Sequence, residues 1–169
     1  LLAAKKPELV FQPGTQWQYC NTNYTTLASV IEKVSGTTAD QFFQQHIAGP
    51  LKLSNTYIYN LEMKSYPPSR VFGFNYEKGI PVLNDLVRLD GIVGDGNVYS
   101  SVEDMYAWDQ ALYTEKLVKH STFKEAITAG KLNNGEATQY GFGWFINAPD
   151  KTVSHTGGWV GFATLITRY

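Results

Sequence analysis

Apolar residues recur at helical spacing in the first part of the chain. Four of them fall at positions i, i+3, i+4 and i+7 and so share one helix face: Leu27, Val30, Ile31 and Val34. We predict that this helix begins near Tyr24. It should end at Gly36, because glycine readily adopts the left-handed conformation that terminates helices.

A second helix is predicted to begin at Thr38, where Gln41 three residues later completes a capping box. Its core-facing residues are Phe42, Phe43 and Ile47, and Gly49-Pro50 is expected to end it. His46 lies on this helix without a second histidine or a carboxylate at ligand spacing. We therefore interpret His46 as a structural residue and not as a metal ligand.

A third helix should follow Ser101, which forms an N-cap pair with Asp104. The apolar residues of its core face are Met105, Trp108 and Leu112.

Ser121 and Lys124 form a Ser-x-x-Lys sequence, the pattern in which a lysine one turn after a nucleophilic serine takes its proton. The same serine also fits as the ordinary N-cap of a short helix that runs through Ala126 and Ile127 and ends at Gly130. We favour capping, since helix starts select serine for that reason alone.

The remaining apolar pattern indicates short strands bounded by turn residues. The expected extended segments are Tyr57–Tyr59, Val71–Tyr76 with a turn at Lys78-Gly79, Tyr140–Ile146, Thr152–His155 and Phe162–Tyr169. Thr156-Gly157-Gly158 is predicted to break the pattern between the last two strands.

Composition excludes several function classes. The chain has 169 residues, of which 43% are hydrophobic, and a net charge of −1 without a run of either sign. These values fit one globular domain and give no indication of nucleic acid or an anionic membrane as a partner. Cys20 is the only cysteine, which excludes an internal disulfide and a cysteine-based zinc site. No apolar run is long enough to span a bilayer.

No cofactor is predicted. Gly91, Gly94 and Gly96 fit neither dinucleotide-binding nor phosphate-loop spacing. We interpret these glycines as positions where the backbone passes close to something before Ser101.

Tyr19 and Asn21 are the first candidate pair for chemistry. They follow a Pro13-Gly14 turn that presents them at a defined angle. A tyrosine serves as a general base only where positive charge lowers its pKa, whereas an asparagine donates and accepts hydrogen bonds at once. Cys20 between them is interpreted as a bystander. As a bare pattern this triplet is more often structural.

His155-Thr156-Gly157-Gly158 is the second candidate. Two glycines at a strand edge allow a ligand to lie against the backbone, where an N–H faces an oxyanion. The histidine would supply a donor or a charge near pH 7. The alternative is a plain Gly-Gly turn with an exposed histidine.

An ordered series of motifs runs through the chain. It consists of Phe11-x-Pro13-Gly14-x-x-Trp17-x-Tyr19-x-Asn21, Pro50-Leu51-x-Leu53-x-x-Thr56, Gly94 to Ser101 followed by Asp104, Tyr140-Gly141-x-Gly143-Trp144, and His155-Thr156-Gly157-Gly158. The series resembles the serine β-lactamase and DD-peptidase superfamily, above all its class C-like branch of esterases and D-amino-peptide hydrolases. The resemblance implies an α+β fold in one truncated domain, residues 1–169, mainly helical over 1–130 and antiparallel over 131–169.

The resemblance also implies roles in an acyl-serine mechanism. Tyr19 would be the general base and acid, and Asn21 would bind the substrate carbonyl. His155 stands where relatives carry lysine or histidine. Thr156, Gly157 and Gly158 would border the substrate, with Gly158 offering an oxyanion N–H. The substrate would be an ester, a β-lactam or a D-amino-acid peptide, and the location periplasmic or extracellular.

The chain departs from the family order in one respect. Ser-x-x-Lys precedes Tyr-x-Asn in that family, but no serine precedes Tyr19 here, and Ser121 follows it. We therefore expect an inactive internal fragment that lacks the nucleophile helix upstream and the last strand and helix downstream, with an exposed sheet edge that favours self-association. Two alternatives stay open: a non-catalytic ligand-binding protein or sensor of the same fold, and a purely structural module.

Overall fold

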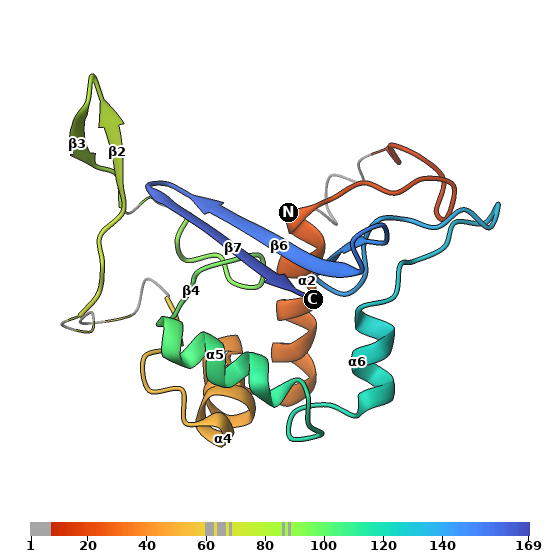
Figure 1. Ribbon diagram of the computed structural model, residues 1–169, viewed down its shortest axis with the longest axis horizontal. Coiled ribbons are helices and arrows are strands. Elements are labelled where there is room, and N and C mark those ends of the chain that lie inside the picture. Colours follow the sequence, from red (N-terminus) through yellow and green to blue (C-terminus); the bar gives the residue numbers. More distant parts are fainter. Residues whose placement is uncertain (1–7, 60–62, 64–66, 68, 86, 88) are drawn as a thin grey trace.

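The structure is a computed structural model that describes residues 8–59, 63, 67, 69–85, 87 and 89–169. It combines helices with antiparallel strands (Figure 1), which confirms the predicted α+β class. The helices are α2 (Asn21–Ser35), α3 (Ala39–Phe43), the π-helix η1 (Gln44–Ala48), α4 (Gly49–Leu51), α5 (Val102–Ala111) and α6 (His120–Ala126). The strands are β1 (Tyr57–Ile58), β2 (Phe74–Glu77), β3 (Ile80–Leu83), β4 (Val98–Tyr99), β5 (Phe145–Asn147), β6 (Thr152–Trp159) and β7 (Phe162–Arg168).

Strands β5, β6 and β7 form a three-stranded antiparallel sheet in that order. The predicted break at Thr156-Gly157-Gly158 is wrong, because β6 continues through these residues to Trp159. Pairing with β7 is unbroken from Val153 opposite Arg168 to Trp159 opposite Phe162. This ladder outweighs the weak strand propensity of the two glycines.

The turn between β6 and β7 contacts a second hairpin, β2–β3. Gly161 donates its N–H to the Asn84 carbonyl at 2.7 Å, and Phe74 donates to the Gly161 carbonyl at 3.3 Å. A Cβ at Gly161 would lie only 2.1 Å from the Phe74 nitrogen, so this approach requires glycine. The β2–β3 hairpin itself is exposed along both strands and projects from the rest of the molecule (Figure 1). Its predicted turn at Lys78-Gly79 is confirmed.

Helix α2 begins at Asn21, three residues before the predicted start at Tyr24, and ends as predicted at Gly36, whose φ is 73°. Its predicted apolar stripe is largely exposed, with Leu27 at 53% and Val34 at 82%. The buried position is Ala28. The predicted apolar stripe of α2 is therefore not part of the core of this chain.

The loop before α5 packs on the buried side of α2. A Cβ at Gly94 would lie 2.5 Å from the Tyr24 carbonyl oxygen and 2.8 Å from the Ala28 Cβ, and φ at Gly94 is 110°. Only glycine combines that conformation with that proximity. The close backbone approach expected for the glycines before Ser101 is thus found at Gly94 but not at Gly96, where a Cβ would meet nothing within 4 Å.

The second helical run begins with the predicted capping box, in which the Thr38 N–H donates to Gln41 Oε1 at 3.5 Å. The predicted end at Gly49-Pro50 is wrong: the run continues through α4 and ends at Lys52, which has φ 58°. Pro50 has no N–H to donate to the preceding helical residues, and the run ends two residues after it. The predicted core residues of this run, Phe42, Phe43 and Ile47, are half-buried.

Asp104 in the first turn of α5 joins two distant motifs. Its Oδ2 accepts from the Asn55 N–H and from the Thr56 hydroxyl, both at 2.7 Å, and Thr56 also contacts the Ser100 hydroxyl at 2.8 Å. The predicted N-cap Ser101 is confirmed, since its hydroxyl accepts from the Asp104 N–H at 3.2 Å. The segment after α4 is thereby fixed to the start of α5.

Two further contacts attach the sheet to the helices. Arg168 on β7 forms an ion pair with Asp109 of α5 at 2.6 Å and lies over the rings of Tyr113 and Phe123. The predicted core residue Trp108 stacks on Trp144 with ring centroids 6.2 Å apart. Of the other two predicted residues of that face, Leu112 is buried, whereas Met105 is 36% exposed.

Ser121 is not the N-cap of its helix. Helix α6 begins at His120 with Lys119 as the N-cap, and it ends at Ala126 instead of reaching Gly130. Ser121 lies exposed in the first turn. No helix within the described ranges is both long and apolar enough to cross a membrane.

Candidate active site

Tyr19 and His155 lie side by side in an aromatic cluster. Their ring centroids are 5.9 Å apart, and Tyr19 also contacts the rings of Tyr140 at 5.7 Å and Phe145 at 6.1 Å. The Pro-Gly turn positions this segment as predicted: Thr15 donates to the Gln12 carbonyl at 3.1 Å, and Gly14 has φ 80°. The structure thus brings the two predicted motifs together.

Both ring nitrogens of His155 have partners. Nε2 lies 2.8 Å from the hydroxyl oxygen of Tyr140, and Nδ1 lies 2.6 Å from the carbonyl oxygen of Thr156. The imidazole is half-buried on β6. Its orientation is therefore set by Tyr140 from one side and by the strand backbone from the other.

The two tyrosines of the cluster hold their protons more strongly than free tyrosine does. Burial, then Tyr24, then the Asp95 carboxylate raise the pKa of Tyr19. Burial, then a hydrogen bond with Tyr24, raise the pKa of Tyr140. Within the described chain no cation lowers the pKa of Tyr19, so a catalytic base here requires positive charge from another segment.

A cleft of about 990 Å³ is lined by sequence neighbours of Tyr19 and His155, although neither of these two residues lines it. Asn21, Gly157 and Gly158 line it together with Asp95, so three predicted site residues border one space. A Cβ at Gly158 would meet nothing within 4 Å, which leaves this part of β6 open on that side. β5 pairs with β6 only as far as Ser154, so the strand edge from His155 to Trp159 has no partner strand among the described residues.

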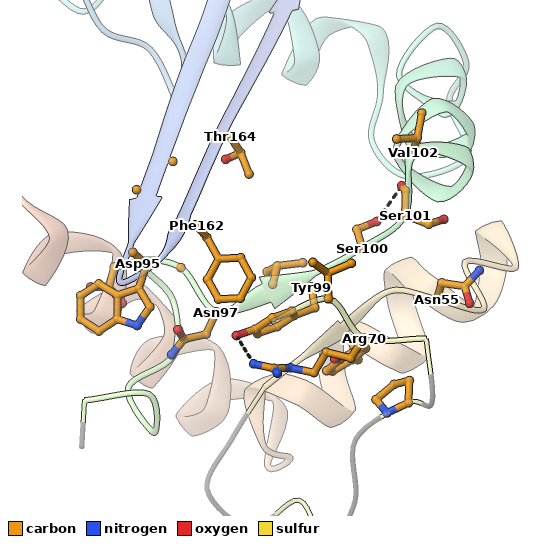
Figure 2. Close-up of a pocket in the computed structure, with 18 of the residues that line it drawn as sticks. Asn55, Arg70, Asp95, Asn97, Tyr99, Ser100, Ser101, Val102, Phe162 and Thr164 are labelled. Carbon is orange, nitrogen blue, oxygen red and sulfur yellow. Dashed lines mark hydrogen bonds between the residues drawn. The ribbon is translucent and has the colours of Figure 1, made fainter. Parts of the chain in front are cut away.

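The walls of the cleft are mostly apolar and aromatic. Figure 2 shows the ring of Phe162 next to the ring of Tyr99, with centroids 5.6 Å apart, and Thr164 further along β7. Arg70 is the one lysine or arginine among the described lining residues, and it is paired with the buried Asp85 at 2.9 Å. Its guanidinium also donates to the Tyr99 hydroxyl at 3.1 Å and lies over the Tyr99 ring.

Some residues of the site were not identified from the sequence. The sequence analysis assigned no role to Tyr140 of the Tyr140-Gly141-x-Gly143-Trp144 motif, although its hydroxyl contacts His155. Trp159 borders the cleft and donates its indole N–H to the buried Asp90. Neither contact has a sequence signal, because each joins residues from separate segments.

Two other polar residues singled out in the sequence lie elsewhere. The ring of His46 contacts the ring of Phe42, with centroids 4.4 Å apart and ring planes tilted by 37°. Cys20 is an exposed free thiol. Among the described residues, no group of three or more histidine, cysteine, aspartate or glutamate side chains is arranged to hold a metal ion.

Comparison with known proteins gives the family. Penicillin-binding protein 4* of Bacillus subtilis (strain 168) is 37% identical over 94% of this chain and 38% of that protein. A D-aminopeptidase of Brucella ovis is 27% identical over 88% of this chain and 28% of that protein. The octameric penicillin-binding protein homologue from Pyrococcus abyssi has a TM-score of 0.78 and 26% identity, over 94% of this chain and 37% of that chain.

The chain thus spans between 28% and 38% of the length of these three proteins. Residues 3–168 match the Beta-lactamase family. Because this match covers nearly the whole sequence, the chain belongs to the Beta-lactamase family.

Proposed function

We propose that this chain supplies the general-base and substrate-binding part of an acyl-serine hydrolase site, and that the nucleophile comes from a Ser-x-x-Lys segment outside it. The observation that carries this proposal is the proximity of Tyr19 to His155, whose sequence neighbours Asn21, Gly157 and Gly158 line one cleft. Tyr19 is the proposed base and acid, and Asn21 the ligand of the substrate carbonyl. The Gly158 N–H is the proposed oxyanion donor, with Thr156 and Gly157 beside it.

If Tyr19 is the general base, it requires positive charge from outside the described residues. Its pKa is raised and not lowered by the neighbours it has here. A lysine next to the incoming serine would reverse this balance, because a nearby cation favours the phenolate. Ser121 does not fill the role: it is exposed on α6, and the ring contacts of Tyr19 are with other segments.

The proposed substrate of the whole protein is an ester, a β-lactam or a D-amino-acid peptide. Relatives named penicillin-binding protein and D-aminopeptidase support this range. This chain alone is proposed to be inactive. Self-association through an exposed sheet edge is a further part of the proposal, supported by the unpartnered edge of β6 from His155 onward among the described residues. Sedimentation velocity of the chain at increasing concentration tests it, and a strictly monomeric species contradicts it.

Intact-mass spectrometry after incubation with a penicillin or an activated ester tests the catalytic proposal. We expect a covalent adduct on the longer protein that carries Ser-x-x-Lys upstream of Leu1, and none on this chain. The matched control is Ser121→Ala in both proteins, which should leave the result unchanged. An adduct on Ser121 of this chain would overturn the proposal.

A second candidate function is ligand binding without turnover by a protein of the same fold. The observation that favours it is the raised pKa of Tyr19 in the absence of a neighbouring cation. If the longer protein binds a penicillin reversibly and forms no adduct, this candidate replaces the hydrolase.

A further inference from the structure

The imidazole of His155 has a defined pattern of donors and acceptors. The carbonyl oxygen of Thr156, 2.6 Å from Nδ1, is an acceptor only. Nδ1 must therefore carry a hydrogen. In the neutral ring the other nitrogen, Nε2, is then an acceptor.

Tyr140 is the partner of this second nitrogen. Its hydroxyl oxygen lies 2.8 Å from Nε2, and the residue is 8% exposed. Burial, followed by the hydrogen bond with Tyr24, raises the pKa of Tyr140, so a phenol and not a phenolate faces Nε2. The neutral Nδ1–H tautomer satisfies both contacts of His155 when this hydroxyl donates to Nε2.

The position of Tyr140 is itself fixed. Its carbonyl accepts from the Gly130 N–H at 3.1 Å and from the Thr138 hydroxyl at 3.0 Å. Its ring packs edge-on against Phe145, with centroids 4.8 Å apart. Backbone bonds and ring packing thus hold the hydroxyl where it meets His155, so removing the hydroxyl alone leaves these contacts in place.

We propose that Tyr140 is a positioning residue that holds His155 as the neutral Nδ1–H tautomer beside Tyr19. The assignment rests on the proposed function in that it takes His155 as part of the site. One consequence concerns the substrate. A neutral imidazole offers no permanent cation to a carboxylate, so this strand edge would suit an uncharged ester or amide.

Long-range proton–nitrogen NMR correlation of the histidine rings tests the tautomer directly on this chain. The chain has three histidines, and the His155→Gln variant identifies the signals of interest. We expect a protonated Nδ1 and an unprotonated Nε2 at neutral pH. In Tyr140→Phe the Nε2 signal should shift, because this nitrogen loses its hydrogen-bond partner. The matched control is Tyr76→Phe on the exposed β2–β3 hairpin, which should leave the spectrum unchanged.

A protonated Nε2 with an unprotonated Nδ1 in the unsubstituted chain overturns the proposal. An unchanged spectrum in Tyr140→Phe overturns it as well. The spectrum of the unsubstituted chain decides the tautomer even if a variant fails to fold.

A kinetic measurement on the longer protein addresses the role. With a neutral ester, Tyr140→Phe should lower kcat by about tenfold or more at a similar KM, since a misdirected histidine tautomer impairs catalysis. Unchanged turnover contradicts the positioning role. Complete absence of turnover in the unsubstituted longer protein overturns the proposed function alone, because the spectra still decide the tautomer.

Discussion

The ring of Tyr19, at the entrance to α2, lies 5.9 Å from the ring of His155 on β6. Phe145 contacts both rings and holds the two segments together, at 6.1 Å from Tyr19 and 5.3 Å from His155. The segment before the first described helix and the last hairpin of the chain thus share one site.

If Tyr19 is the general base, Tyr19→Phe should lower kcat of the longer protein by about 10²–10⁴-fold, the range that positioned acid–base groups contribute. The substitution removes only the hydroxyl and keeps the ring contacts, so circular dichroism should be unchanged. Tyr76→Phe on the exposed hairpin is the control, with full activity expected. Steady-state kinetics with an activated ester give the measurement, and an active Tyr19→Phe variant would remove Tyr19 from the mechanism.

Asp104 should be essential for stability. Asp104→Ala leaves the Asn55 N–H and the Thr56 hydroxyl without their acceptor, and we expect unfolding free energy to fall by about 1–3 kcal/mol. Glu103→Ala, one residue earlier on the same helix and exposed, is the matched control with little effect expected. Urea unfolding followed by tryptophan fluorescence measures both. Equal midpoints for the two variants would show that the Asp104 bonds contribute nothing net.

Gly94 and Gly96 form a second matched pair. Gly94→Ala places a methyl group 2.5 Å from the Tyr24 carbonyl oxygen at a φ of 110°, whereas a Cβ at Gly96 meets nothing within 4 Å. Backbone strain alone costs about 1–3 kcal/mol in such a position. Thermal or urea unfolding should therefore show a lower midpoint for Gly94→Ala and a small change for Gly96→Ala. The reverse order would mean that the loop does not pack on α2.

Alkaline pH should destabilise the chain through Tyr140. Its pKa is raised in the folded state by burial and by Tyr24, so the folded state keeps a proton that the unfolded state releases above pH ~10. The stabilisation is complete below that pH and is lost as pH rises toward the folded-state pKa. Urea midpoints at about pH 8 and about pH 11 should show a smaller loss in Tyr140→Phe than in the parent chain. An identical loss in both would assign the effect to other groups.

Local signals in the sequence predicted several elements well. The spacing of Leu27 to Val34 predicted a helix and Gly36 its end, and Lys78-Gly79 predicted a hairpin turn. The start of α2 was misplaced because its N-cap, Cys20, forms no side-chain cap hydrogen bond and leaves no signal.

Non-local pairing explains most of the errors and omissions. The Gly157-Gly158 pair suggested a break, but the pairing of β6 with β7 keeps both residues in the strand. The same limit hid the contact between Thr56 and Asp104, which are 48 residues apart in sequence. It also hid the bond between Tyr140 and His155. All four residues belong to motifs recognised in the sequence, but the motifs did not indicate that residues of different motifs are in contact.

The unbroken course of β6 has a consequence for changes in chain length. His155 and Gly158 are three residues apart on one extended strand, which separates them by about 10 Å. An insertion or deletion within β6 shifts every following residue to the opposite face of the sheet. We therefore expect related sequences to vary along this strand by substitution far more often than by insertion. Length variation is expected in the projecting β2–β3 hairpin, which contains no predicted site residue whose position in a strand would change.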